Sequence, residues 1–214
     1  MDPLLIEVPE RLQTERLLLR PPRPGDGPAI CEAVAASLAE LRPWMPWAQG
    51  EPTPEEAEAN ARRTLAKFML REDLTFALFD ANTGQVLGGT GLHRIDWSLP
   101  RFEIGYWCRT GFTGRGLVSE AVRALSRMAF DTLMAQRVEI RMDDRNAGSR
   151  RVAERAGFSF EGLLRRDTVA VDGFVRDTRV YSRVRGIEEP LVPAPVPGFV
   201  PAFVPSLEDA AGAG

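Results

Sequence analysis

Residues 103–121 read EIGYWCRTGFTGRGLVSEA, and this stretch joins a strand pattern to a glycine-rich turn and a helix start. Apolar residues alternate along 102–108, which is the period of a β-strand. Glycines then recur within 111–116, and apolar residues at helical spacing run from about Leu117 to about Leu133. Glycines let the backbone approach an anion closely, and a helix start offers unpaired N–H groups. The stretch therefore predicts an anion-binding turn within an α/β fold.

The turn does not match the two common nucleotide-binding motifs. Ser119 stands where the third glycine of G-x-G-x-x-G would be, and no Gly-Lys-Ser or Gly-Lys-Thr sequence is present. The dinucleotide-binding and P-loop interpretations are therefore excluded. Arg115 and the Ser119 hydroxyl would add hydrogen-bond donors to the turn. A tight connection whose glycines serve only packing is the alternative for this turn by itself.

The flanking sequence alternates between strand and helix patterns. A capping box at Thr53 and Glu56 marks the start of one helix. The other boundaries follow from changes of hydrophobic period and from turn residues. The predicted strands are 12–20, 75–80, 85–95, 102–108, 138–142, 158–171 and 174–184, and the predicted helices are 28–41, 54–70, 117–133 and 146–156. This order predicts an α/β fold with a mixed sheet.

A second motif lies at 146–158, which reads NAGSRRVAERAGF. Asn146 suits the cap of a helix and Gly157 suits its C-terminal end. By itself the motif predicts only a capped helix with solvated arginines. Following the glycine-rich turn and a further strand, it forms a composite that is far rarer than either part.

The composite resembles the GNAT superfamily of acyl-CoA N-acyltransferases, and within it the RimJ/RimL-like branch. The resemblance covers roughly residues 12–184. Its motifs are TERLLLR at 14–20, EIGYW at 103–107, GRGL at 114–117 followed by Ser119-Glu120-Ala121, N-x-x-S-x-x-V-x-E-x-x-G-F at 146–158, Glu161-Gly162 and Tyr181-Ser182. Together they are specific for the family and not for a substrate.

The resemblance implies a GNAT fold, which is a mixed, mostly antiparallel sheet with splayed central strands and flanking helices. It implies one acyltransferase domain over 1–188 that moves an acetyl group directly from acetyl-CoA to a primary amine without a metal. In the family the glycine turn wraps the pyrophosphate of coenzyme A, and the pantetheine arm lies between two splayed strands. The coenzyme A-binding residues implied here are Trp107, Cys108, Arg109, Gly111, Thr113, Gly114, Arg115, Gly116, Leu117, Val118, Ser119, Asn146, Ser149, Arg150 and Arg151.

Within this set, Asn146 is expected to contact pantetheine, and Arg150 or Arg151 the adenosine 3′-phosphate. The chain departs from the family pattern at two positions. Gly111 stands where a Gln or Arg side chain usually binds, and Ala153 stands where many members carry a tyrosine proton donor. Ser149, near the sulfur, is therefore the expected proton donor to the leaving thiolate.

The amine must lose a proton before it attacks a thioester, so a base or a water chain is needed. Glu103 is the first candidate, with a role as a cross-strand charge partner as its alternative. His93 is the natural base by its titration range. It precedes the glycine turn, however, and a lone histidine is more often a filler. Cys108 is not expected to carry the acetyl group, because direct transfer needs no nucleophile on the protein.

The acceptor stays open between a protein N-terminal α-amine and a small amine such as an antibiotic, a polyamine or an amino acid. Trp44, Trp47 and Trp97 would border its entrance by the family fold, or else serve as core residues. Asp172 and Asp177 are further candidates for contacts with its ammonium group. Another acyl donor, such as succinyl-CoA, also stays open. The alternative from another functional class is a non-catalytic acyl-CoA sensor or scaffold.

Composition argues against several other classes. Lys+Arg 27 and Asp+Glu 30 give a net charge of −3, so no nucleic-acid partner is expected. Two cysteines and one histidine form no readable metal site or disulfide framework. No apolar run reaches the roughly 18–20 residues that span a bilayer, and the N-terminus lacks a basic signal-peptide region. A cytoplasmic protein without a membrane partner is therefore expected, with a homodimer left open. Residues 189–214, rich in Pro, Val and Phe, are predicted as a tail that is either loosely ordered or an arm on a protein surface.

Overall fold

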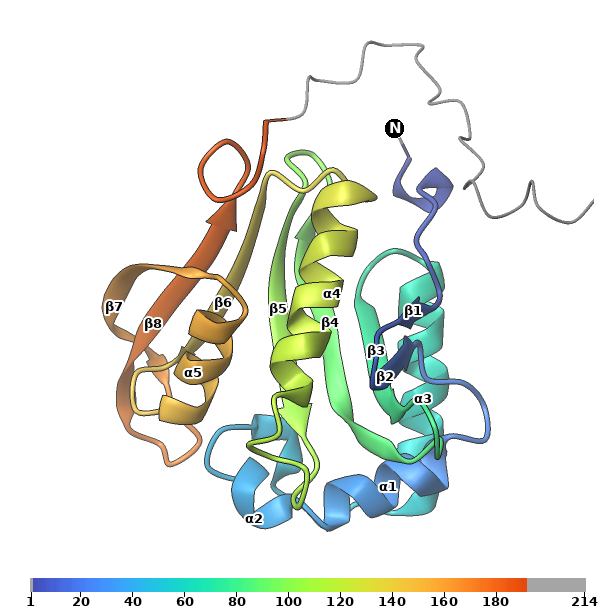
Figure 1. Cartoon of the computed structure of the whole chain (residues 1–214). Coiled ribbons are helices and arrows are strands. Elements are labelled where there is room, and N and C mark those ends of the chain that lie inside the picture. Colours follow the sequence, from blue (N-terminus) through green and yellow to red (C-terminus); the bar gives the residue numbers. More distant parts are fainter. Residues whose placement is uncertain (1, 192–214) are drawn as a thin grey trace, which may run out of the picture.

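An open sheet of eight strands, in the order β1-β2-β3-β4-β5-β6-β8-β7, runs through the computed structural model, which describes residues 2–191 (Figure 1). The strands are β1 Leu12–Gln13, β2 Leu17–Arg20, β3 Leu74–Asp80, β4 Val86–Asp96, β5 Arg101–Cys108, β6 Arg137–Asp143, β7 Ser159–Val169 and β8 Val175–Val184. The helices are α1 Gly27–Ala35, α2 Leu38–Leu41, α3 Pro54–Met69, α4 Leu117–Asp131 and α5 Ala147–Arg155, with short 3-10 turns η1 Pro3–Leu5 and η2 Pro46–Ala48. The predicted α/β fold with a mixed sheet is confirmed.

The sheet opens between its central strands β5 and β6. These strands are parallel, and their register runs only from Arg101 beside Arg137 to Glu103 beside Glu139. The described strands that neighbour one another elsewhere in the sheet are antiparallel. Figure 1 shows β5 and β6 separating beyond this short paired region. The predicted splayed central strands are therefore confirmed, and they leave an unpaired backbone edge on β5.

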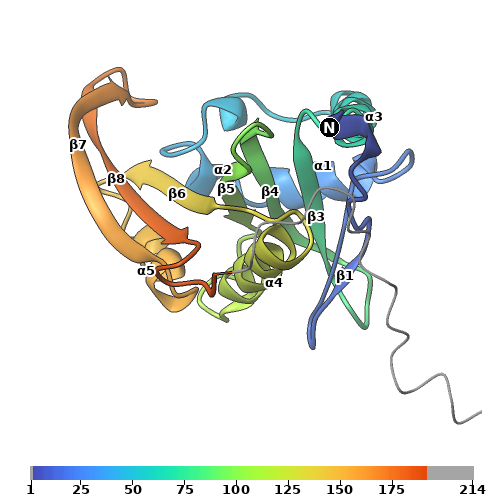
Figure 2. The same cartoon turned by 90° about the horizontal axis from the view of Figure 1, so that it is seen from above.

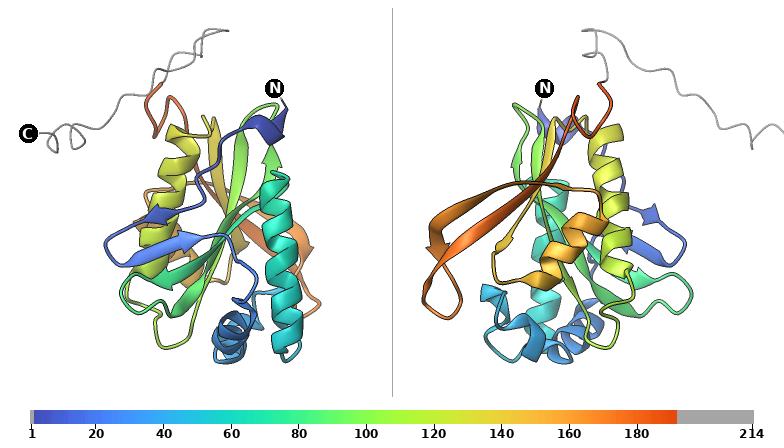
Figure 3. Two further views of the ribbon diagram at one scale, coloured as in Figure 1. Left: turned by 90° about the vertical axis from the view of Figure 1, so that its right-hand side faces the viewer. Right: turned by 60° about the vertical axis from the view of Figure 1, so that its left-hand side comes forward.

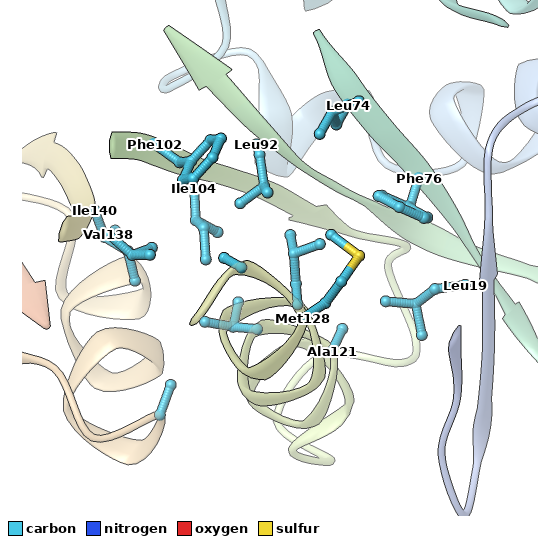
Figure 4. Close-up of a cluster of buried hydrophobic side chains, with 14 of the residues drawn as sticks. Leu19, Leu74, Phe76, Leu92, Phe102, Ile104, Ala121, Met128, Val138 and Ile140 are labelled. Carbon is cyan, nitrogen blue, oxygen red and sulfur yellow. The ribbon is translucent and has the colours of Figure 1, made fainter. Parts of the chain in front are cut away.

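Helix α4 covers the middle of one sheet face with an apolar stripe. Ala121 and Met128 are buried on this stripe and face Phe76, Leu92 and Ile104 from the sheet (Figure 4). Complete burial of a large apolar side chain contributes about 1.5–3 kcal/mol to folding relative to leaving it exposed. This packing holds the start of α4, and with it the preceding glycine turn, beside the end of β5.

Helices α1 to α3 lie on the opposite face of the sheet (Figure 2). Helices α1 and α3 approach so closely that a Cβ on Gly27 would lie 2.5 Å from the Glu58 Cα. The Glu58 carboxylate accepts hydrogen bonds from the N–H groups of Gly25 and Gly27, which satisfies donors at the start of α1. The predicted capping box of Thr53 and Glu56 begins α3. The two helices therefore form one packed pair beside the sheet.

Two predicted elements are each divided in the structure. The first predicted strand is the hairpin β1–β2, because the Thr14 hydroxyl accepts a hydrogen bond from the Leu17 N–H at 3.0 Å and closes a turn. The first predicted helix is divided into α1 and α2. There the Ser37 hydroxyl donates to the Ala33 carbonyl at 2.7 Å, an alternative bond that competes with the helical ladder.

The β7–β8 hairpin extends from the sheet beside α5 (Figure 3). It was predicted as the final element and is confirmed. The predicted tail at 189–214 lies outside the described residues from residue 192 onward. Within residues 2–191, no helix combines the length and the apolarity needed to cross a membrane.

Candidate active site

A cleft of about 990 Å³ lies where β5 and β6 separate. Strands β4, β5 and β6 form its floor. The loop 43–47 and helix α3 form one wall, and the turn at 169–171 forms the other. Its inner end reaches Asn146 and Ser149 at the start of α5. The volume is at the upper end of the range of about 300–1,000 Å³ that small-molecule sites occupy.

The glycine-rich turn joins the end of β5 to the start of α4. Gly111, Gly114 and Gly116 have φ values of +88°, +76° and +78°, a region that residues with a Cβ rarely adopt. Among the described residues, no hydrogen bond uses the backbone N–H groups of 113–119. A row of free donors at a helix N-terminus favours a phosphate or another anion. The turn therefore has the form expected of an anion cradle.

Helices α1 and α2 anchor the beginning of this turn. The Arg109 guanidinium donates to the Glu32 carboxylate at 2.6 Å, and its side chain is only 13% exposed. The Thr110 N–H donates to the Ser37 hydroxyl at 3.0 Å, and the Thr110 hydroxyl donates to Glu40 at 2.8 Å. The side chain of Arg109 is thus committed to the scaffold, and its contact with coenzyme A stays a prediction.

The β1–β2 turn anchors the other end of the glycine turn. The Thr14 hydroxyl donates to the Glu120 carboxylate at 2.6 Å, and the Arg16 guanidinium bonds to the same carboxylate. Arg16 also donates to the Arg115 carbonyl at 2.9 Å. Burial by itself raises the pKa of Glu120, but these hydrogen bonds lower it below its ordinary value. Glu120 therefore stays ionised and joins the TER motif to α4.

The unpaired edge of β5 presents selected backbone groups to the gap. The Arg109 N–H donates to the Leu87 carbonyl on the β4 side at 2.8 Å. Antiparallel strands alternate between residues that bond to one neighbour and residues that bond to the other. The backbone groups of Tyr106 and Cys108 therefore face the gap, whereas those of Trp107 and Arg109 face β4. The family resemblance implies that backbone groups within 107–109 pair with pantetheine, and of these the groups of Cys108 face the gap.

Asn146 and Ser149 lie together at the start of α5. The Asn146 Oδ1 accepts the Ser149 N–H at 2.9 Å, so Asn146 caps the helix as its position in the sequence indicated. The Ser149 Oγ lies 2.8 Å from the hydroxyl oxygen of Tyr106, and this hydroxyl also donates to the Ser149 carbonyl at 3.1 Å. Burial raises the pKa of Tyr106, although its bond with Ser149 acts in the opposite direction. A neutral phenol therefore adjoins the predicted proton donor.

Glu103 lines the cleft from β5. Burial raises the pKa of its carboxyl above the ordinary value, while Arg94 opposes the shift and Glu139 adds to it. The Arg94 Nε lies 3.4 Å from Oε2, yet this oxygen is buried without a hydrogen bond among the described residues. Such an oxygen can accept a hydrogen bond or a proton from a ligand in the cleft.

His93 also lines the cleft, on β4 and in register with Glu103. Its Nδ1 lies 2.7 Å from the Asp73 Oδ2. The imidazole is therefore held at one ring nitrogen while its side chain lines the cleft. The pairing of Asp73 with His93 was not predicted from the sequence, because 20 positions separate the two residues and no local pattern joins them.

The Cys108 thiol is protonated at neutral pH. Burial raises its pKa to about 11, although Arg115 acts in the opposite direction. Since the thiolate is the nucleophilic form, this environment gives Cys108 little reactivity. It agrees with the expectation that Cys108 does not carry an acetyl group.

The tryptophans divide between the cleft and the core. Trp44 and Trp47 line the cleft, and Trp47 meets Trp107 edge to face with ring centroids 6.1 Å apart. Trp97 does not line it. Its ring instead packs edge to face on Phe102 at 5.4 Å, next to the main core. Of the two roles left open for Trp97, the structure therefore contains the core role.

The remaining candidate residues lie at the edge of the site. Arg150 and Arg151 are on the first turns of α5 and reach solvent, with Arg150 only 3.9 Å from Glu154 in a weak pair. Asp172 accepts a hydrogen bond from a neighbouring arginine, and Asp177 accepts one from a backbone N–H of β7. Neither aspartate lines the large cleft. Within residues 2–191, no three His, Cys, Asp or Glu side chains are grouped to hold a metal ion.

A family model described as an acetyltransferase (GNAT) domain matches residues 16–159. The protein YdaF of Bacillus subtilis (strain 168) is 30% identical over 174 residues, which make up 80% of this chain and 92% of YdaF. The ribosomal-protein-serine acetyltransferase of Escherichia coli (strain K12) is 26% identical over 151 residues, 69% of this chain and 83% of that protein.

Solved structures share the fold. RimL, a ribosomal L7/L12 alpha-N-protein acetyltransferase solved in complex with coenzyme A, superposes with a TM-score of 0.75. The match covers 82% of this chain and 98% of the RimL chain at 23% sequence identity. At this identity the likeness is one of fold.

Proposed function

This chain belongs to the acetyltransferase (GNAT) family, and we propose that it acetylates the α-amine at the N-terminus of a protein. Its relatives include ribosomal-protein acetyltransferases, and the chain is an N-acetyltransferase that moves an acetyl group to an amine. The class of acceptor and the roles of individual residues are what we propose.

Acetyl-CoA is the proposed donor, and the residues present fit it. The glycine turn combines positive φ values with free N–H groups, and a Cβ on Gly116 would project into open space near the Arg16 guanidinium, 3.7 Å away. This is the space that a pyrophosphate would need to reach the backbone donors. When bound, the donor supplies an activated acetyl thioester. The residues that would hold it are those of the turn, Gly111, Thr113, Gly114, Arg115 and Gly116, and those of the helix start, Leu117, Val118 and Ser119.

The gap between β5 and β6 would hold the pantetheine arm. The gap-facing backbone of Tyr106 and Cys108 can pair with its amides as a neighbouring strand would. The Asn146 side-chain amide group has donors left after Oδ1 caps α5. Arg150 and Arg151, exposed at the same helix, would contact the adenosine 3′-phosphate with little geometric selectivity.

Ser149 is proposed to act on the leaving sulfur, and Glu103 on the ammonium group of the acceptor. The Ser149 hydroxyl, supported by Tyr106, would donate a proton to the leaving sulfur. The Glu103 carboxylate would accept a hydrogen bond from the ammonium group of the acceptor, and it is the base expected from the sequence. Both line the same cleft, so donor and acceptor would meet between them.

The shape of the cleft supports a polypeptide acceptor. The cleft extends from Ser149 to the loop 43–47 and the turn at 169–171. Trp44 and Trp47 give this outer part an aromatic wall, and Trp47 is 55% exposed. Such side chains combine apolar area with one hydrogen-bond donor, which suits an extended peptide of varied sequence. If the acceptors are ribosomal proteins, the enzyme acts in the cytoplasm.

N-terminal profiling tests this function. The protein is incubated with isotopically labelled acetyl-CoA and an extract whose protein N-termini are free, and labelled acetyl groups are located by mass spectrometry. We expect label on α-amines of a limited set of proteins. Label confined to lysine side chains or to small molecules would contradict the proposed acceptor and leave the acetyltransferase assignment intact.

A further inference from the structure

We propose that His93 is the base of the acetyl transfer and that Asp73 positions it, so that the imidazole Nε2 accepts the proton that the acceptor's ammonium group must lose. The inference rests on the proposed function, because it concerns the amine bound in the same cleft. It assigns proton acceptance to His93 and leaves Glu103 to bind the cation.

Asp73, His93 and Glu103 lie in one row across the sheet. Asp73 directly precedes β3, and His93 on β4 is in register with Glu103 on β5. The imidazole thus bonds to one carboxylate, that of Asp73, and a second carboxylate stands at the register partner of His93 on β5. The side chains of His93 and Asp73 are 33% and 29% exposed, which leaves the ring accessible from the cleft while one edge is held.

Two glycines make room for the imidazole against the sheet. A Cβ on Gly91 would lie 2.8 Å from the His93 Cε1, and a Cβ on Gly105 would lie 3.0 Å from Cδ2 and 3.1 Å from Nε2. Gly91 and Gly105 are themselves register partners on β4 and β5. The ring therefore lies over a surface without side chains, and a methyl group on either glycine would displace it.

Asp73 determines which ring nitrogen is free. The Asp73 Oδ2 lies 2.7 Å from Nδ1, and a carboxylate can only accept, so Nδ1 carries the proton of the neutral ring. The Thr75 hydroxyl donates to the other Asp73 oxygen at 2.5 Å. Burial by itself raises the pKa of Asp73, but the bonds from His93 and Thr75 bring it below the ordinary value. Nε2 has no hydrogen-bond partner within residues 2–191, so its lone pair is available to a ligand.

The charges near this pair come from several elements. They are Asp73 before β3, Lys67 and Arg63 on α3, Arg94 on β4, Glu103 on β5, and Glu139 and Arg141 on β6. The nearest partner of the imidazole is the Asp73 carboxylate, which stabilises the ring in the orientation that a base requires. Glu103, the half-buried register partner of His93 on β5, is the second carboxylate of the cleft, and it complements the positive charge of an incoming ammonium group.

Two protons leave the acceptor nitrogen during the transfer. The ammonium group gives one proton to Nε2 and becomes a neutral amine. Its nitrogen then forms the C–N bond to the acetyl carbon as the C–S bond breaks, and the sulfur leaves with the bonding electron pair. Ser149 gives its hydroxyl proton to the sulfur, which becomes the thiol, and the second proton lost by nitrogen returns to the Ser149 oxygen. His93 returns its proton to water, so the amide, the thiol and one released proton are the products.

The tautomer can be observed directly, because His93 is the only histidine of the chain. Nitrogen NMR of the ¹⁵N-histidine-labelled protein, prepared without a histidine tag, reports each ring nitrogen separately. We expect a protonated Nδ1 and a bare Nε2 at alkaline pH. Asp73→Asn should shift the population toward the other tautomer, since an amide can donate to Nδ1. A protonated Nε2 in the wild type would overturn the proposal.

Kinetics test the role in catalysis. We expect His93→Gln to lower kcat by about 10²–10⁴-fold, the usual cost of losing a positioned base. The KM for acetyl-CoA should change less than about twofold, because the pair lies outside the coenzyme A cradle. The acidic limb of the pH–rate profile should disappear. Asp73→Asn should lower kcat with the same KM pattern, and Asp73→Glu should recover part of it. Glu72→Gln, at an exposed neighbouring carboxylate, is the matched control and should match the wild type.

The assignment of His93 as the base and the proposed protein acceptor can fail independently in these experiments. The variants are compared with whichever amine the wild type acetylates best. A preference for a small amine would contradict the proposed protein acceptor, while the loss in His93→Gln would still support the base. Full activity of His93→Gln with an unchanged acidic limb would overturn the base, even if protein N-termini prove to be the acceptors.

Discussion

The hydroxyl oxygen of Tyr106 lies 2.8 Å from the Ser149 Oγ, although 43 positions separate the two residues in the chain. Tyr106 is on β5 and Ser149 is on α5, so this contact crosses the gap that the splayed strands leave. Because Ala153 stands where many members carry a tyrosine, the sequence indicated Ser149 as the proton donor. The structure shows that the phenol of Tyr106, on β5, forms a hydrogen bond with the Ser149 hydroxyl.

This contact predicts unequal and non-additive effects of two substitutions. Ser149→Ala should lower kcat by about 10²–10⁴-fold with little change in acetyl-CoA affinity, because a proton donor acts at the transition state. Tyr106→Phe should lower kcat less, since the serine hydroxyl remains. The double variant should be no slower than Ser149→Ala, because both residues act through one hydroxyl. Full activity of Ser149→Ala would make water the proton donor.

The glycine cradle can be tested with a matched pair of alanine substitutions. Gly116 and Gly84 have similar φ values, +78° and +72°, so an added Cβ strains both by about 1–2 kcal/mol. Both variants should therefore lose a similar amount of thermal stability. Coenzyme A should raise the melting temperature of Gly84→Ala as it does the wild type, because a ligand that binds the native state stabilises it. For Gly116→Ala this shift should be strongly reduced, and a normal shift would mean that the cradle lies elsewhere.

The raised pKa of Glu103 predicts that its ionisation destabilises the folded protein in a pH-dependent way. Burial raises the pKa of the Glu103 carboxyl in the folded state above its ordinary value, so folding favours the protonated carboxyl. The associated stabilisation is complete below the unfolded-state pKa and is lost as the pH rises through the folded-state pKa. Glu103→Gln should therefore gain melting temperature relative to the wild type near neutral pH and lose that advantage at about pH 4. A constant difference across this range would show that the carboxyl is not ionised in an unfavourable environment.

The position of Trp47 predicts that its substitution alters the KM for the acceptor and not the KM for acetyl-CoA. Its exposed ring lines the outer cleft, away from the glycine turn. Trp47→Ala should raise the KM for a peptide acceptor several-fold while the KM for acetyl-CoA stays the same, because uniform binding is lost on one substrate only. Leu5→Ala, at an exposed apolar residue of η1, serves as the control. Equal KM values for the peptide in both variants would remove Trp47 from the acceptor site.

The parts of the fold with strong local patterns could be predicted from the sequence. The strand at 102–108, the glycine turn and α4 follow from alternation, glycine spacing and helical period, and the capping box of α3 lies where Thr53 and Glu56 indicated. The divided first strand was not predicted. The strand is divided because of the Thr14 hydroxyl. This group accepts a hydrogen bond from the Leu17 N–H within the β1–β2 turn and donates one to the distant Glu120 carboxylate.

The candidate site was only partly predictable for a similar reason. Residues of the glycine turn and the start of α5 are close in sequence and carry their own signals. The pair of Asp73 and His93 depends on the register of β3 and β4, which side-chain patterns leave undetermined to within a few residues. The two glycines beneath the imidazole appear as unremarkable strand residues until this register is known.

Acetylation of paired synthetic peptides tests the central claim most directly. The two peptides share one sequence with a single internal lysine, and differ only in a free or a blocked N-terminus. Thiol release and product mass are measured with acetyl-CoA. We predict that the free peptide gains one acetyl group on its α-amine and that the blocked peptide gives only background. Equal acetylation of both peptides, or of neither while a small amine reacts, would contradict transfer to a protein N-terminus.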